Sequence, residues 1–297
     1  MTTPAADTDA NTASTRTQDA AVAGRVRIGT EGQIGWIVID NERRRNALTL
    51  AMWAAIPEAV ARLCADPEPR VIVLRGAGDD TFVAGADISE FATVRRDAAS
   101  ARAYEAANAA AFDALREASL PTIAMVRGFC LGGGFGLAAA CDLRIADATA
   151  RFGIPAARLG VGYPPSAIAD VVRLVGPSRA KLLFFTARQF GASEAQGLGI
   201  VDTLATDTPL EQATRDLAQA IAQGAPLTLK AAKAGIDALT AHLSDEELAT
   251  CQALADACFD SADFAEGRAA FMEKRTPRFT GSPGQDLGQK PGRTFRG

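Results

Sequence analysis

The chain has 297 residues, 48% of them hydrophobic and 22% charged, a composition typical of a globular protein with a substantial core. Its net charge of −4 argues against a nucleic-acid partner, because surfaces that bind nucleic acid are usually basic. We expect a cytoplasmic protein with no membrane partner, since no apolar run is long enough to cross a bilayer and the N-terminal residues lack the apolar segment of a signal peptide.

Four regions follow from the composition and the apolar periodicity. Residues 1–24, rich in Ala, Thr and Asp, predict a disordered N-terminal arm, and residues 281–297 predict a disordered tail. Residues 25–205 alternate strand and helix patterns, which predicts an α/β core. Residues 206–280 have helical spacing and predict a helical C-terminal region.

The predicted elements begin with a hairpin and end with a series of helices. Expected strands are 25–29 and 33–40, which form the hairpin, then 70–76, 122–128, 143–147 and 200–202. Expected helices are 47–64, 97–118, 136–142, 166–175, 177–187, 193–198, 209–223, 227–241, 245–259 and 261–275. Pro57 should kink or interrupt the first helix. Loops are expected at 76–91, around the triple glycine and from residue 151 onward.

Two glycine-rich segments, residues 82–88 and 128–136, carry the candidate chemistry. Each follows a buried strand, so both could reach the edge of the sheet where open α/β folds usually bind ligands. Three consecutive glycines bring bare backbone close to a ligand, and the first N–H groups of the next helix have no intrahelical partner. A thioester carbonyl that gains negative charge would be stabilised there, at about 3–4 kcal/mol for one preorganised donor.

Two other interpretations of the glycines stay open at this point. In the first, the glycines serve only the close packing of a helix against a strand. The pattern Gly134-x-Gly136-x-x-Ala139 also matches a weak nucleotide-binding fingerprint, which needs an acid about twenty residues further on. Asp147 follows Gly134 by only thirteen residues, which argues against that fingerprint.

Several motifs in order resemble the crotonase (enoyl-CoA hydratase/isomerase) family over about residues 25–280. They are N-x-x-R-R-N-A-L-T (41–49), FVAGADISEF, PTIAMVRGFCLGGGFGLAAACDLRIAD, RFGIPAARLG and FTARQFGASEAQGLGIVD. The resemblance implies a crotonase-type spiral of ββα units with a helical C-terminal trimerisation region, in a homotrimer or hexamer. It also implies an acyl-CoA substrate, with coenzyme A as part of the thioester and no permanently bound cofactor.

The resemblance further implies roles for individual positions. Ala86 and Gly133 match the two backbone donors of the family's oxyanion hole, which stabilises an enolate. The positions that match coenzyme A contacts are Arg45, Ala47, Ala84, Asp87, Ile88 and, in the C-terminal segment that relatives often contribute from a neighbouring subunit, Lys274 and Phe279.

The chain departs from the family where a hydratase needs its two glutamates. Gly136 and Ala156 stand at those positions, and neither can exchange a proton. Tyr163 resembles the pocket tyrosine of the family's methylmalonyl-CoA decarboxylases, although Ala86 replaces the histidine of those enzymes. The expected activity is therefore that of an acyl-CoA lyase or isomerase whose exact reaction is open. Decarboxylation of a malonyl-type CoA and non-catalytic binding of acyl-CoA are the alternatives.

The remaining polar side chains have ordinary structural interpretations as well. Arg158 could pair with a substrate carboxylate or form an exposed salt bridge. Asp142 and Asp147 flank a strand and are expected to serve turns and helix ends. His242, the only histidine, is far in sequence from both glycine segments, and no G-x-S-x-G elbow is present, which argues against a Ser-His-Asp hydrolase. The five cysteines lack metal-type spacing, so we expect reduced thiols and no metal site.

Overall fold

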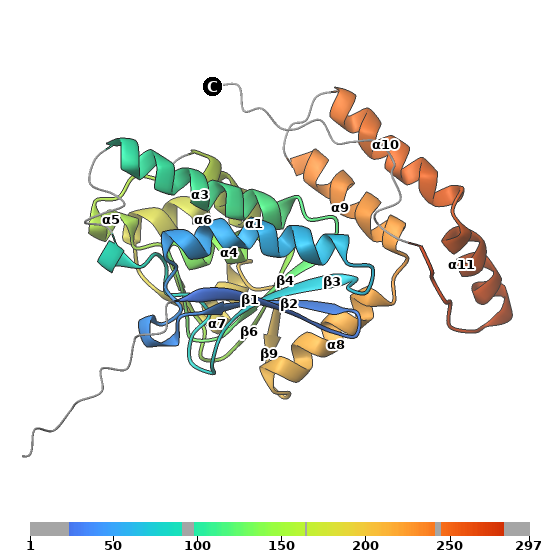
Figure 1. Cartoon of the computed structure of the whole chain (residues 1–297), viewed down its shortest axis with the longest axis horizontal. Coiled ribbons are helices and arrows are strands. Elements are labelled where there is room, and N and C mark those ends of the chain that lie inside the picture. The colour runs from blue at the N-terminus through green and yellow to red at the C-terminus, as the bar shows by residue number, and fades with distance from the viewer. Residues whose placement is uncertain (1–23, 91–97, 164, 241–244, 282–297) are drawn as a thin grey trace, which may run out of the picture.

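The computed structural model describes residues 24–90, 98–163, 165–240 and 245–281 (Figure 1). The predicted N-terminal arm and C-terminal tail lie outside these residues, except for Gly24 and Gly281. His242 also lies outside them. Among the described residues, no helix is long and apolar enough to cross a membrane.

A six-stranded sheet forms the centre of the molecule, in the order β1-β2-β3-β4-β6-β9. Its strands are β1 (Arg25–Glu31), β2 (Ile34–Asp40), β3 (Val71–Gly76), β4 (Thr122–Val126), β6 (Leu143–Asp147) and β9 (Thr203–Ala205). Only the β1–β2 pair is antiparallel, and it is the predicted hairpin, turning at Gly32 with a φ of 55°. All the other neighbours are parallel, so the carboxyl ends of β2, β3 and β4 lie at one edge.

A second, three-stranded sheet has the order β5-β7-β8 and was not predicted. Its strands are β5 (Phe129–Leu131), β7 (Arg151–Gly153) and β8 (Phe190–Gly191). The predictions of a turn at β5 and of a loop at β7 are therefore wrong. The strands have only two or three residues, too few to show alternation, and their pairing joins distant segments such as Phe129 and Arg151.

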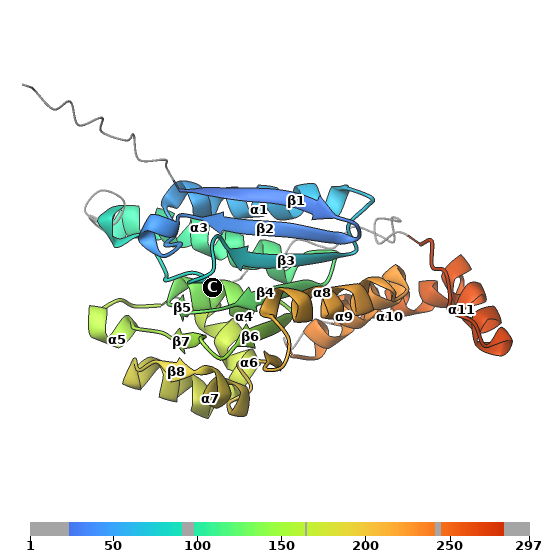
Figure 2. The ribbon, with the colours of Figure 1, turned by 90° about the horizontal axis from the view of Figure 1, so that it is seen from below.

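Helices cover both faces of the main sheet (Figures 1 and 2). The helices on one face are α1 (Leu50–Ala65), α3 (Ala98–Arg116), α4 (Gly133–Ala140) and α6 (Pro165–Thr186). On the other face, α8 (Leu210–Ala222) packs against four of the strands. Strand residues alternate between two buried clusters: Ile72 and Leu74 face the first group of helices, whereas Val71 and Val73 face α8.

Two predictions about helix breaks have different outcomes. The break predicted between 166–175 and 177–187 is confirmed, because Gly176 leaves helical geometry with φ 76° and ψ 166° inside α6. The interruption predicted at Pro57 does not occur, and α1 continues as one helix to Ala65. Buried residues on both sides of Pro57, such as Trp53 and Val60, hold the two halves against the same core.

The rest of the chain consists of short connecting elements and a helical C-terminal region. The short elements are η1 (Glu42–Arg44), η2 (Ile88–Glu90), α5 (Ala156–Leu159) and α7 (Ala192–Gly197). The late strand lies at β9 rather than at 200–202, because Ile200 and Val201 are buried in the core instead. The helices α9 (Pro226–Thr240), α10 (Asp245–Phe259) and α11 (Ala262–Glu273) extend away from one end of the sheet, as Figures 1 and 2 show.

Candidate functional site

Backbone hydrogen bonds hold the two glycine-rich segments together at the carboxyl edge of the sheet. Val83 N donates to Phe129 O at 2.9 Å, and Leu131 N donates to Val83 O at 3.0 Å. On the other side, Leu48 N donates to Gly85 O at 2.8 Å, and Asp87 N donates to Leu48 O at 2.8 Å. The segment 83–87 thus lies between the residues that follow β2 and those that follow β4.

The N–H groups of Ala86 and Gly133 are left unused by this network. Gly85 O and Asp87 N both face Leu48, so the N–H of Ala86 points away from that bridge. Gly133 is the first residue of α4, and its N–H has no intrahelical acceptor. Within the described ranges, neither N–H donates to a protein acceptor. Both residues line one pocket with an empty volume of about 550 Å³.

Glycine is required in these segments for two reasons: other backbone atoms come too close for a side chain, and the backbone adopts conformations that favour glycine. A Cβ at position 134 would lie 2.2 Å from Val83 O, so only glycine fits there without a shift of the backbone. Gly85 has a φ of 110° and Gly132 a φ of 53°, both in the region that favours glycine. The packing role considered for the triple glycine is therefore real, and it accompanies the exposure of Gly133 N–H to the pocket.

Apolar side chains form most of the pocket wall, and four polar side chains interrupt it. The apolar lining includes Trp53, Ala109, Phe112, Val161 and Ala167. The polar side chains are Glu105, Asn108, Tyr163 and Ser166. A mostly apolar pocket with a few convergent polar groups is the usual form of a small-molecule site.

Glu105 and Asn108 are pocket residues that the sequence interpretation missed. They lie on α3 together with Ala109 and Phe112, at the spacing i, i+3, i+4 and i+7 that places residues on one helix face. The signal was present in the sequence, because two polar residues fall on the helix stripe that also contains the buried Phe112. Which stripe of α3 faces the glycine segments became clear only from the packing.

Tyr163 lies next to the triple glycine, as its sequence position suggested. A Cβ on Gly132 would be 3.6 Å from Tyr163 Oη, so the phenol group approaches the loop that contains Gly133. The ring packs edge-on against Phe184, with 5.4 Å between centroids. Tyr163 also borders a second, apolar cavity with an empty volume of about 780 Å³.

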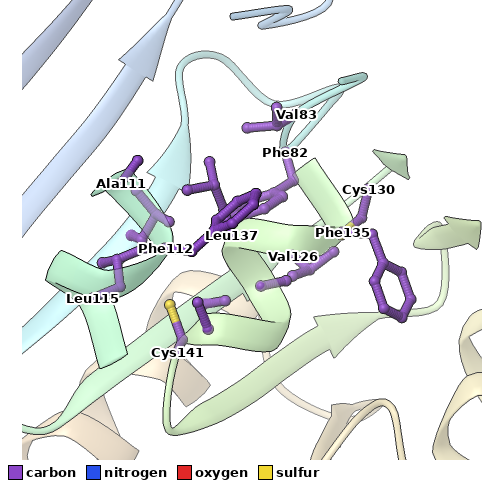
Figure 3. Packing of buried hydrophobic residues seen from close by; sticks show 14 of the residues in the cluster. Phe82, Val83, Ala111, Phe112, Leu115, Val126, Cys130, Phe135, Leu137 and Cys141 are labelled. Carbon is purple, nitrogen blue, oxygen red and sulfur yellow. The ribbon is translucent and has the colours of Figure 1, made fainter. Parts of the chain in front are cut away.

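The two positions expected to have lost glutamates are enclosed by apolar groups. A Cβ on Gly136 would lie 2.6 Å from Cζ of Phe112, whose ring fills the space beside α4 (Figure 3). Ala156 is buried at the beginning of α5 and lines the second cavity. Neither position offers an acid to the pocket.

The predicted coenzyme A residues near the N-terminus surround the same edge of the sheet. Arg45 stacks over the ring of Phe129 at 5.3 Å and lines a separate pocket of about 550 Å³. Asp87 is buried, and its Oδ1 accepts hydrogen bonds from the N–H and hydroxyl of Ser89. Ile88 is 62% exposed, which leaves its side chain open to a ligand. Ala47 and Ala84 complete this set: Ala47 is buried, and Ala84 N donates to Arg45 O at 3.1 Å.

The two predicted residues in the C-terminal segment lie elsewhere. Lys274 is exposed at the end of α11. Phe279 O accepts a hydrogen bond of 2.9 Å from Nη2 of Arg70, which precedes β3 and so lies at the amino edge of the sheet. Within a single chain, these residues are therefore at the opposite end of the strands from Ala86 and Gly133.

The other polar candidates do not line the pocket, and two of them have the structural roles expected from the sequence. Asp142 Oδ2 accepts from Thr122 N and from Lys233 Nζ, and Asp147 Oδ1 accepts from Thr149 N, so both aspartates stabilise local structure as expected. Arg158 is exposed and forms no ion pair in the parts of the chain that are described, so the expected salt bridge is absent there.

Comparison with known proteins decides the family. The model of the enoyl-CoA hydratase/isomerase family matches residues 29–282. The chain belongs to the enoyl-CoA hydratase/isomerase family. A short-chain-enoyl-CoA hydratase of Clostridium acetobutylicum is 33% identical over 82% of this chain and 93% of its own length. A crotonyl-CoA hydratase of Syntrophomonas wolfei is 32% identical, with 84% of this chain and 95% of the relative covered.

Solved structures of enoyl-CoA hydratase/isomerase proteins confirm the predicted fold class. An enoyl-CoA hydratase/carnitine racemase from Magnetospirillum magneticum has a TM-score of 0.80 at 36% identity, covering 86% of this chain and 95% of that one. The chain therefore has the crotonase fold and belongs to an enzyme family that acts on coenzyme A thioesters.

Proposed function

We propose that the pocket binds an acyl-CoA thioester and that the N–H groups of Ala86 and Gly133 donate hydrogen bonds to its oxygen as an enolate forms. The observation that carries this proposal is the pair of N–H groups, each without a protein acceptor, on one pocket at the carboxyl edge of the sheet. Removal of one such donor typically lowers turnover by 10²- to 10³-fold, because the developing charge loses about 3–4 kcal/mol of stabilisation.

Coenzyme A would lie along the same edge of the sheet. The guanidinium group of Arg45 supplies positive charge beside the phosphates, and the segment containing Ala47, Ala84, Asp87 and Ile88 borders the pantetheine arm. The moiety is part of the substrate, and no permanently bound cofactor is required.

A homotrimer or hexamer would bring Lys274 and Phe279 of one copy to the site of another. Two observations support this assembly: the residues lie far from the pocket of their own chain, and α11 exposes large apolar side chains. Phe271 is 82% exposed and Met272 is 77% exposed, which is costly for a helix that faces only water.

The substitution Ala86→Pro tests the oxyanion hole. Proline removes the N–H of residue 86 but spares the bridge to Leu48, because that bridge uses Gly85 O and Asp87 N. We expect turnover of acyl-CoA substrates to fall at least 10²-fold while the affinity for coenzyme A changes little. Ala86→Gly keeps the N–H and is the control. Equal turnover in the two folded variants would refute the assignment.

Decarboxylation of a malonyl-type CoA is the second candidate, favoured by the approach of Tyr163 Oη to the triple glycine. Loss of carbon dioxide generates the enolate without a general base. Incubation with a panel of acyl-CoA thioesters, followed by mass spectrometry, separates the candidates. Release of carbon dioxide that falls in Tyr163→Phe supports decarboxylation, and saturable binding without any turnover indicates a non-catalytic acyl-CoA-binding protein.

A further inference from the structure

The side of α3 that faces the pocket contains a carboxylate to which no role has been given. Glu105 is half-buried and lines the same cavity as Ala86 and Gly133. It is the only Asp or Glu among the residues described as lining this cavity. The helix places it two turns before Phe112, the residue whose ring closes off Gly136.

We propose that Glu105 is the proton-transfer group of this pocket, in place of the glutamates missing at Gly136 and Ala156. The reaction that tests it is the isomerisation of 3-enoyl-CoA to 2-enoyl-CoA, one of the two activities in the family's name. This proposal rests on the proposed binding of the thioester at Ala86 and Gly133. A single carboxylate suffices for isomerisation, because the proton removed from one carbon is returned to another. Hydration uses two carboxylates in this family, and the two positions expected to hold them are Gly136 and Ala156.

The step balances without any further reactant. Glu105 carboxylate takes a proton from C2 of the 3-enoyl thioester, and the C–H electron pair forms the C1–C2 double bond. The carbonyl electron pair moves onto oxygen, where the N–H groups of Ala86 and Gly133 hold it. The oxyanion then re-forms the carbonyl, the C1–C2 pair shifts to make the C2–C3 double bond, and the former C3–C4 double bond takes the proton from Glu105 at C4.

Asn108 is an independent sign that a polar group belongs at this place. Its Oδ1 is buried and accepts no hydrogen bond from the described residues, although it lies on the pocket wall one turn from Glu105. A buried carbonyl oxygen without a donor costs about 1–3 kcal/mol. The carboxylic acid that Glu105 becomes after taking the proton is a donor on the same helix face.

The surroundings of Glu105 suit proton transfer to carbon. Trp53, Ala109, Phe112 and Val161 make the wall around it largely apolar, so bound acyl-CoA would exclude most water. Exclusion of water strengthens the interaction of the enolate oxygen with its two donors and keeps the abstracted proton on the carboxyl group until it is returned.

The experiment compares Glu105→Gln and Glu105→Asp with Glu117→Gln in the full-length protein. Glu117 is exposed just after the end of α3 and does not line the pocket, so its substitution controls for loss of one carboxylate. Two reactions are followed: exchange of the C2 protons of butyryl-CoA in D₂O by mass spectrometry, and conversion of 3-hexenoyl-CoA to the conjugated 2-enoyl product by absorbance. Binding of butyryl-CoA is measured by calorimetry.

We expect Glu105→Gln to lower kcat for both reactions by about 10²- to 10⁴-fold with the Kd of butyryl-CoA unchanged. Glu105→Asp should keep part of the activity, because it retains a carboxylate, and Glu117→Gln should match the wild type. Wild-type rates in Glu105→Gln would overturn the role of Glu105 and leave the proposed function standing. Binding by the wild type without exchange or isomerisation would overturn both the role of Glu105 and the enolate step, and would leave only acyl-CoA binding. Absence of butyryl-CoA binding in the wild type would instead overturn the proposed function.

Discussion

Gly134 lies where α4 passes close to Val83 in the segment 83–87, so Gly134→Ala should damage the candidate site without touching a ligand. The added Cβ would lie 2.2 Å from Val83 O and 2.8 Å from Val83 Cβ. Ordinary contact begins at 3.4 Å, so the two segments must separate by 1.2 Å (3.4 − 2.2). Overpacking of this kind destabilises a protein by about 1–3 kcal/mol.

The same shift would move Gly133 N–H relative to Ala86 N–H, and a misplacement of about 1 Å can lower turnover by 10²-fold. Urea denaturation gives the free energy of unfolding, and turnover is measured per folded molecule. Gly235→Ala, in the middle of α9, is the control, since its Cβ would meet nothing within 4 Å. That change should stabilise the helix by up to about 1 kcal/mol. Gly134→Ala with wild-type stability and full turnover would refute the packing argument.

Four further predictions concern residues around the core. Gly136→Glu alone should destabilise the protein, because the new Cβ would lie 2.6 Å from the ring of Phe112. Adding Phe112→Ala should recover part of the lost melting temperature. An equal drop in melting temperature in the single and double variants would contradict this. Arg144 is 5% exposed and donates hydrogen bonds to three backbone carbonyls and a carboxylate. Arg144→Met should therefore lower the free energy of unfolding, measured by urea denaturation, by about 3 kcal/mol. A loss below about 0.5 kcal/mol would show that these bonds contribute little. Burial raises the pKa of Cys141 to about 12 and raises that of Cys130, so neither thiol should react with a disulfide reagent at pH 8 in the native state. Because the pKa of Cys141 is higher in the folded chain than its ordinary value of 9.0, stability should fall as the pH rises from 9.0 toward 12; a flat profile there would contradict the burial argument.

The long elements of the fold could be predicted from the sequence, whereas the small sheet could not. The hairpin alternates apolar residues around Gly32, and β3 and β4 are continuous apolar runs, so their local pattern is sufficient. Strands β5, β7 and β8 have no such pattern. Their partners lie 22 or more residues away along the chain (Phe129 to Arg151, Arg151 to Gly191), and only the tertiary structure brings them together.

The same distinction applies to the site. Ala86 and Gly133 could be proposed from the sequence, because glycine patterns and strand ends determine where bare backbone is exposed. Glu105 could not, because a helix stripe acquires meaning only when its neighbour is known. Phe112 likewise required the structure, since nothing in the sequence indicates that its ring lies against Gly136.

The proposed hydrogen-bond donors of this site are peptide nitrogens, which constrains how the chain can change by mutation. Exchange of the side chain at Ala86 leaves its N–H in place unless proline is introduced. Selection can therefore alter the residues on α3 and the 161–163 loop while the proposed donor at residue 86 persists. Gly133 has less freedom, because a Cβ there would lie 2.7 Å from the indole of Trp53. Divergence to new reactions is thus expected to proceed through the pocket wall rather than through the donors themselves.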